Sequence, residues 1–208
     1  MARSGEQAVG ETGRMRLKPQ ERRDQVIEAA TEIISRQGLW GFSVHQVAKE
    51  LGLTEPAVIY HFKNKVGLLV AVLEHRDQLD LEYSAERMGV TYQDLYDGNV
   101  SLGLRQITET SMERNVQQPE IVRLYMILQG ESLSKTHPAY EYYQERERRA
   151  VGRMTLAAAR DGFENPEHEG RVAISMMDGL QTRWLRDLDH VDLVAEWREF
   201  ADSRWGSR

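Results

Sequence analysis

Hydroxyl, aromatic, imidazole and basic side chains are concentrated between residues 43 and 65, in the segment SVHQVAKELGLTEPAVIYHFKNK. The apolar pattern leaves a set of these side chains on an outer face, namely Thr54, Glu55, Ala57, Tyr60 and His61, followed by Lys63 and Lys65. Hydroxyls, small methyl-bearing groups and a phenol can contact base edges in a DNA groove or phosphates, and ammonium groups contact phosphates. The chemistry predicted for this segment is recognition of a double-stranded nucleic acid.

Two short helices joined by a tight turn are needed to position these side chains. Ser43 suits the N-cap of the first helix, because Gln46 follows three residues later as a capping-box partner. Gly52 suits the turn, and Thr54 suits the N-cap of a second helix with Pro56 in its first turn. The small core between the helices would consist of Val47, Leu51, Leu53 and Val58. The pattern predicts a helix-turn-helix over residues 43–62.

The charge balance differs between the two parts of the chain. The 208 residues include 27 Lys/Arg and 33 Asp/Glu, for a net charge of −6. Residues 1–76 hold 11 Lys/Arg and 9 Asp/Glu, whereas the remaining residues hold 16 and 24. This change of sign favours contact between the first part and a polyanion. The absence of cysteine excludes disulfides, thiolate metal sites and a cysteine nucleophile, and it fits a cytoplasmic location.

The composition favours an all-α fold, because good helix formers dominate and only 5 prolines and 16 glycines occur. We expect a first helix from about Gln20 that ends at Gly38, and a fourth helix that runs from Asn64 towards Leu79. Residues 88–99 are expected to break the chain between helices. Further helices are expected near 101–115, 119–133, 138–161, 167–188 and 191–204. No apolar stretch is long enough to span a membrane.

The order and spacing of these residues resemble the DNA-binding domain of the TetR family of bacterial transcriptional regulators. The resemblance rests on Ser43, Gly52-Leu53-Thr54, Tyr60-His61-Phe62 and Lys65, and it covers roughly residues 20–80. It implies a three-helix helix-turn-helix DNA-binding domain at 19–80, and the residues before it, which mix Gly, Ser, Arg and Glu without an apolar period, predict a flexible basic arm at 1–18. The resemblance also implies a C-terminal helical ligand-binding and dimerisation domain at 81–208.

The resemblance also assigns roles to individual residues. Phosphate contacts are implied for Ser43, Tyr60, His61 and Lys65, with Lys63 beside them. Contacts with base edges are implied for His45, Thr54, Glu55 and Ala57. The chain departs from the family pattern at Ile59, where a tyrosine is frequent, and at Val44, where a second hydroxyl is common.

Structural interpretations of the same residues stay open. Tyr60 could belong to the core, and His61 could form a hydrogen bond within the motif. Glu55 could only stabilise the helix N-terminus, and the basic arm could be a solvated tail.

Two apolar stripes in the C-terminal part predict a homodimer interface. The residues expected there are Met176, Leu180, Leu188, Val194, Trp197 and Ala201. The alternative is that these helices pack only within one protomer. Methionine and aromatic residues also suit a ligand pocket among the middle helices. The pocket candidates are Tyr83, Met112, Tyr125, Met126, Met177 and Trp184, each of which could instead be ordinary core.

The function predicted from these observations is that of a homodimeric repressor, which a small-molecule effector releases from a palindromic operator. The expected partners are double-stranded operator DNA, a second copy of the chain and the effector, without a membrane. The alternative is a ligand-independent DNA-binding organiser of the same fold. An enzyme is not expected, because the sequence has no phosphate-binding glycine loop, no nucleophile elbow and no His-x-x-x-His pair. We expect neither a cofactor nor a metal.

Overall fold

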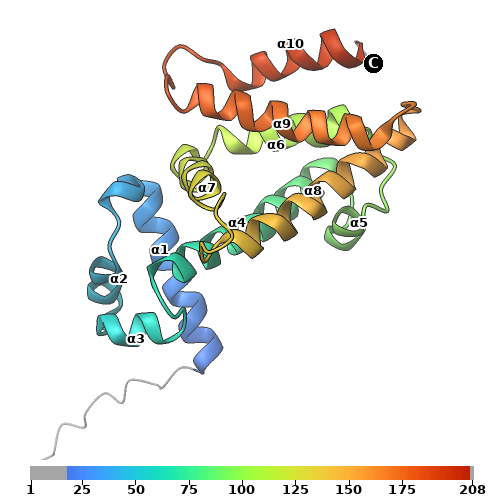
Figure 1. The fold of residues 1–208 in the computed structure, drawn as a ribbon. Helices are drawn as coiled ribbons and strands as arrows, with labels where there is room; N and C mark the ends of the chain where they lie inside the picture. Colours follow the sequence, from blue (N-terminus) through green and yellow to red (C-terminus); the bar gives the residue numbers. More distant parts are fainter. Residues whose placement is uncertain (1–17, 207–208) are drawn as a thin grey trace, which may run out of the picture.

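A computed structural model describes residues 18–206 of the chain. These residues form ten helices and no strand, which confirms the predicted all-α fold (Figure 1). The helices are α1 (Pro19–Gly41), α2 (Val44–Leu51), α3 (Glu55–Tyr60), α4 (Lys65–Met88), α5 (Tyr92–Asp97), α6 (Leu104–Asn115), α7 (Pro119–Glu131), α8 (Tyr140–Arg160), α9 (Pro166–Trp184) and α10 (Leu193–Trp205). Apart from Lys18, the basic arm expected at 1–18 lies outside the described residues.

Side-chain caps fix where the N-terminal helices begin. The hydroxyl of Ser43 accepts the Gln46 N–H at 3.3 Å, and the Gln46 side chain accepts the Ser43 N–H at 2.8 Å. This capping box starts α2. Thr54 caps α3 and Asn64 caps α4 in the same manner, each accepting a backbone N–H three residues later. Each cap satisfies an N–H that has no partner within its helix.

Two hydrophobic clusters make up the core. One cluster joins α1, α2, α3 and the first half of α4 to α7 and the start of α8. The other joins the second half of α4 to α5, α6, the rest of α8, α9 and α10. Neighbouring residues of α7 belong to different clusters, since Ile121 packs in the first and Val122 in the second. The helix α4 runs through both, and the domain boundary expected after residue 80 falls inside it. Both helices therefore connect the two ends of the molecule (Figure 1).

The helix pattern differs from the prediction at three places. The expected break at 88–99 contains α5, which Thr91 caps and whose Leu95 is buried in the second cluster. The chain does leave helical geometry at Gly38 (φ 70°, ψ 172°), but α1 continues to Gly41. Helix α9 ends at Trp184, so Leu188 stands in the connection to α10, outside the stripe that it was expected to extend.

The apolar face of α10 packs within its own protomer. Trp197 and Ala201 are fully buried, because α10 lies against α6 and α9. The Trp197 ring also meets the rings of Phe200 and Trp205 at centroid distances of 5.3 and 5.7 Å. The prediction that Trp197 and Ala201 form a dimer interface is therefore wrong for these two side chains. The alternative left open from the sequence, packing within one protomer, applies to them.

Candidate nucleic-acid interface and ligand cavity

Helices α2 and α3 form a compact pair at the end of the molecule opposite α10 (Figure 1). Gly52 ends α2 in the left-handed conformation (φ 62°, ψ 40°), which lets the chain turn directly into α3. Val47, Ala48 and Val58 are buried between the two helices and α1. This packing fixes the orientation of α3, so the side chains on its outer face have a defined direction.

The outer face of α3 carries the side chains that the sequence assigns to DNA. Thr54, Glu55, Ala57 and Tyr60 are all exposed, and 84% of the Tyr60 surface is accessible. The structure therefore does not place Tyr60 in the core. His61 is partly buried and meets the Tyr60 ring edge-on at 5.5 Å. Because these side chains are exposed, the outer face of α3 is accessible to a groove of DNA.

Two of the side chains expected at base edges are already in contact with each other. His45 Nδ1 lies 3.0 Å from Glu55 Oε1, across the gap between α2 and α3. This pair holds both groups on the exposed side of the helix-turn-helix. A ring nitrogen and a carboxylate at this position can form hydrogen bonds with bases, which present both donors and acceptors in the major groove.

Lys65 stands at the first position of α4, where Asn64 accepts the Gly67 N–H and the N–H groups that precede it can bind an anion. Its Nζ donates a hydrogen bond to the carbonyl oxygen of Phe42 at 3.3 Å and lies 5.4 Å from the Phe42 ring. The ammonium retains further N–H donors. Nearby Lys63 is exposed and adopts φ 67°, which turns the chain from α3 towards α4. The arrangement suits a phosphate held by Lys65 and the start of α4.

A cavity of about 610 Å³ lies between α4, α5, α6, α7, α8 and α9. Of the expected pocket residues, Tyr125 and Met177 line it. Met112 and Trp184 are instead buried in the second cluster, and Met126 packs partly against both clusters. Tyr83 is stacked beneath the guanidinium of Arg114 at 4.9 Å, beside the cavity. The expected aromatic and methionine side chains therefore lie in or near the cavity, but most residues that line it are of other types.

The lining is much more polar than the sequence pattern predicts. Charged groups that the sequence interpretation did not select point into the cavity, namely Glu74, Arg76, Asp77, Asp80, Arg114, Arg146, Arg149, Arg153 and Asp178. At helical spacing such residues are typical of a solvated surface. One signal was present in α4, where Arg76 and Asp80 follow the buried run Ala71–Val72–Leu73. Arg76 is itself buried.

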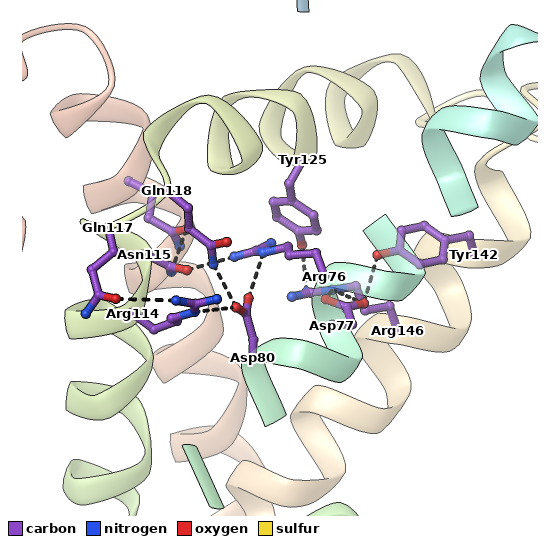
Figure 2. Close-up of polar contacts among 11 residues, drawn as sticks. Arg76, Asp77, Asp80, Arg114, Asn115, Gln117, Gln118, Tyr125, Tyr142 and Arg146 are labelled. Carbon is purple, nitrogen blue, oxygen red and sulfur yellow. Dashed lines mark hydrogen bonds and ion pairs between the residues drawn. The ribbon is translucent and has the colours of Figure 1, made fainter. Parts of the chain in front are cut away.

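One polar network centres on Asp80 and joins α4, α6 and α9 (Figure 2). Its carboxylate accepts hydrogen bonds from Arg114 Nε at 2.9 Å and from Gln118 Nε2 at 2.7 Å. Arg76 Nε lies 2.7 Å from the other carboxylate oxygen, and Arg76 also donates to Asn115 at 2.7 Å. The network continues to α9, because the Asn115 amide donates to the Gln181 side chain at 3.1 Å.

A second network centres on Asp77 and joins α4 to α8 and α7 (Figure 2). Arg146 Nε lies 3.1 Å from both carboxylate oxygens of Asp77, and the Tyr142 hydroxyl donates to Asp77 at 2.8 Å. Arg146 also donates to the Tyr125 hydroxyl at 3.0 Å and lies 4.3 Å above the Tyr125 ring. The guanidinium is thus held between a carboxylate and an aromatic face.

Burial and charge shift the pKa values of the second network. Burial alone would raise the pKa of Asp77, but Arg146, Arg76 and the hydrogen bonds from Tyr142 and Arg146 together lower it below 3.8. Burial raises the pKa of Tyr125 to about 12. Asp77 therefore stays ionised and Tyr125 stays neutral near pH 7. Within residues 18–206, no group of three or more His, Asp or Glu side chains is placed to hold a metal ion. In the same residues, no helix has the length and apolarity needed to cross a membrane.

Comparisons with known proteins agree with this geometry. The family described as bacterial regulatory proteins, tetR family, matches residues 26–72. The chain is 32% identical over 77 residues to the tetracycline repressor protein class C of Escherichia coli, and this match covers 37% of the chain and 35% of the relative. It thus spans about a third of the length of the first curated relatives that it matches.

Longer matches cover nearly the whole chain. The regulator TtgR of Pseudomonas putida is 29% identical over 203 residues, which cover 91% of the chain and 92% of the relative. Among solved structures, the transcriptional regulator FadR of Bacillus subtilis in complex with stearoyl-CoA gives a TM-score of 0.63 at 16% identity. That match covers 89% of this chain and 99% of the other, and at this identity it supports the fold alone.

Proposed function

Because the chain belongs to the TetR family of bacterial regulatory proteins, we propose that it is a sequence-specific DNA-binding regulator of transcription. We further propose that it acts as a homodimeric repressor, which a small molecule in the cavity releases from a palindromic operator. The observation that carries the proposal is the outer face of α3, where Thr54, Glu55, Ala57 and Tyr60 are exposed on a helix whose orientation is fixed.

The role of each side chain at the DNA follows from its position. Thr54, Glu55 and Ala57 lie in the first turn of α3, the part of a recognition helix that contacts base edges. Tyr60, at the other end of α3, and Lys65, at the start of α4, would contact phosphates. Two copies of α3 about 34–36 Å apart would fit successive turns of the major groove. This spacing requirement favours a dimer on a palindromic site.

The remaining candidates for the dimer interface are Met176, Leu180, Leu188 and Val194. Met176, Leu180 and Val194 are partly buried at the edge of the second cluster, whereas 42% of the Leu188 surface is exposed. An apolar side chain exposed to this extent gains stability when a second copy covers it.

The helix α4 supplies the link between the cavity and the DNA-binding face. Its first residue is Lys65, and its middle residues Arg76, Asp77 and Asp80 line the cavity. A ligand that binds better to one position of α4 would shift the populations of DNA-binding and released forms. The exposed α3 face and the shared helix together support regulation by a small molecule.

Selection of duplexes from a random pool tests the DNA-binding proposal. We expect the wild-type chain to enrich a palindrome, and the double variant Tyr60→Ala/Lys65→Ala to lose it. The matched control is Trp40→Ala/Lys135→Ala, which removes an aromatic side chain as exposed as Tyr60 (83% against 84%) and an exposed lysine outside the helix-turn-helix. Loss of enrichment in the control as well, or no enrichment by the wild-type chain, would count against the proposal.

Measurements on the recovered site separate phosphate from base contacts. Lys65→Ala should weaken binding to all duplexes and reduce the slope of log K against log salt by about one unit. Substitutions at Thr54 or Ala57 should change which bases are preferred, by about 1–3 kcal/mol per lost contact. Melting curves of each variant serve as a control for folding, because Lys65→Ala also removes the hydrogen bond to Phe42.

A further inference from the structure

Three arginines of α8 line the cavity at positions 146, 149 and 153, with the helical spacing of three and four residues that places them on one face. Two of them have partners. Arg146 is paired with Asp77, and Arg149 lies 3.4 Å from a carboxylate oxygen of Glu145 while donating to the Tyr96 hydroxyl at 3.3 Å. Within residues 18–206, Arg153 has neither a carboxylate oxygen within 4 Å nor a hydrogen-bond partner.

The surroundings of Arg153 leave a positive charge uncompensated. The side chain is partly buried, and burial, followed by the charges of Arg146 and Arg149, lowers its pKa. Asp77 of α4 and Tyr96 of α5 act in the opposite direction but do not reach it as partners. An arginine remains charged under these conditions, because its guanidinium does not deprotonate in proteins. Because Arg153 is only partly buried, water reaches its guanidinium, and a bound anion would replace this water with a charge-assisted pair.

Apolar side chains form one part of the cavity lining, beside the charged and amide groups described above. They are Leu95, Ile107, Met154, Ile174 and Met177, with the stacked rings of Tyr92 and Tyr96 at 5.9 Å beside them. The volume of about 610 Å³ lies in the range of pockets for small organic ligands. The cavity thus combines one cation without a partner with an apolar part of its lining large enough to contact a hydrocarbon group.

The negative charge of Asp178 makes the part of the cavity beside α9 unfavourable for an anion. It lines the cavity from α9, accepts a hydrogen bond from Gln129 at 2.9 Å and has no cation within 4 Å among the described residues. Its oxygens are therefore also more than 4 Å from the Arg153 guanidinium. A ligand acid group would avoid Asp178 and bind at Arg153.

We propose that the cavity binds a small organic anion, whose carboxylate or phosphate pairs with Arg153 and whose apolar body lies between α5, α6 and α9. The identification of this anion as the effector rests on the proposed function. Two classes of ligand fit this description, namely carboxylates and phosphate monoesters that carry an apolar group.

A panel of acids and matched neutral compounds tests the proposal. The probes are benzoate, 2-naphthoate, 4-phenylbutyrate and decanoate, each beside its primary amide, and phenyl phosphate beside phenol. We expect at least one acid to raise the melting temperature of the full chain while its neutral counterpart does not. Calorimetry on that acid should show about tenfold or greater weakening in Arg153→Gln, because a charge-assisted contact is lost. If only phenyl phosphate binds, the source is a phosphate, and if only carboxylates bind, it is a carboxylate.

Two control variants are expected to leave the affinity for the acid unchanged or to increase it. Arg148→Gln removes an exposed arginine of the same helix and should leave the affinity unchanged. Asp178→Asn removes a negative charge from the cavity and should leave the affinity unchanged or increase it. The unliganded Arg153→Gln variant should melt no lower than the wild type, since it loses no hydrogen-bond or ion-pair partner. The proposal is overturned if no acid shifts the melting temperature, if the neutral compounds bind equally, or if Arg153→Gln binds within about twofold of the wild type.

Failure of this inference is distinguishable from failure of the proposed function, because ligand binding is measured without DNA. Selection of a palindrome without acid binding would leave the regulator intact and reject the anion. Acid binding that depends on Arg153, without enrichment of any duplex, would do the reverse. When both occur, adding the acid to the protein–DNA complex shows whether the anion releases the operator.

Discussion

Asp77→Asn is the substitution that most directly tests how the cavity is held together. Both carboxylate oxygens of Asp77 lie 3.1 Å from Arg146 Nε, and Asp77 also accepts a hydrogen bond from the Tyr142 hydroxyl at 2.8 Å. Asparagine has nearly the same shape but no charge, and its amide nitrogen cannot accept either bond. The substitution therefore leaves Arg146 over the Tyr125 ring without its counter-ion.

The expected cost follows from the burial of the pair. Removing one partner of a fully buried pair costs about 3–5 kcal/mol. Here the side chains of Arg146 and Asp77 remain 26% and 25% exposed, so water compensates part of the loss. We expect a decrease of about 2 kcal/mol in the free energy of unfolding at pH 7. For a chain of this size, that corresponds to a fall of about 4–8 °C in the melting temperature.

A double-mutant cycle with Arg146→Met, followed by urea unfolding, isolates the interaction of the two side chains. We expect a coupling energy of about 1–2 kcal/mol, because the double variant no longer contains an uncompensated cation. Asp189→Asn, an exposed position in the connection before α10, is the control and should change stability by less than about 0.5 kcal/mol. A coupling below about 0.5 kcal/mol would refute the assignment of Asp77 as the counter-ion of Arg146.

The pH dependence provides a second check with a defined sign. The pKa of Asp77 is lower in the folded chain than its ordinary value of 3.8. Its contribution to stability is therefore complete at any pH well above 3.8 and decreases as the pH falls through the lowered folded value. The difference between wild type and Asp77→Asn should be equal at pH 7 and pH 5 and should shrink only below about pH 4.

Three further predictions concern other parts of the chain. Gly67→Ala would place a Cβ atom against the carbonyl oxygen of Phe62, so it should lower the free energy of unfolding by about 2 kcal/mol or more. Gly130→Ala, whose Cβ atom would meet nothing within 4 Å, should not destabilise the chain. Equal melting temperatures for these two variants would contradict the strain. Burial raises the pKa of Asp178, so the folded chain disfavours its ionised form; Asp178→Asn should stabilise the chain, with a gain that is small near pH 4 and grows as the pH rises through the raised pKa. A gain independent of pH in melting experiments would oppose this cause. Leu188→Glu should shift the chain from dimer towards monomer in light scattering, and an unchanged mass would remove Leu188 from the interface.

The helix-turn-helix could be predicted because its signals are local. Ser43 and Gln46 are three residues apart, and Gly52 and Thr54 stand where the turn and the next cap are needed. Helix α5 was missed although Thr91 caps it, because six residues with a single buried side chain give no apolar period. Contacts of Leu95 with distant parts of the chain stabilise it instead.

The polar cavity could not be predicted from the sequence, because its contacts join residues far apart in the chain. Asp77 and Arg146 are separated by 69 positions, and Asn115 and Gln181 by 66. An arginine at helical spacing has the same pattern whether it faces water or a cavity. The apolar stripe of α10 shows the same limit, since periodicity identifies an apolar face but not whether its own protomer or a second copy covers it.

Helix α4 links the cavity to the DNA-binding face, because residues of this one helix lie at both places. Lys65 and Asp77 are 12 positions apart on one uninterrupted helix, which corresponds to about 18 Å along its axis. Lys65 is bonded to Phe42 at the end of α1, and Asp77 is bonded to Arg146 of α8. An anion at Arg153 would lie about two helical turns from Arg146 on the same face of α8, so its charge would act on the Asp77–Arg146 pair electrostatically and not by direct contact. Weakening the Asp77–Arg146 pair would loosen the middle of α4 while its start stays attached to α1, and any movement passed on to α2 and α3 would have to include the packing of α1 against α7.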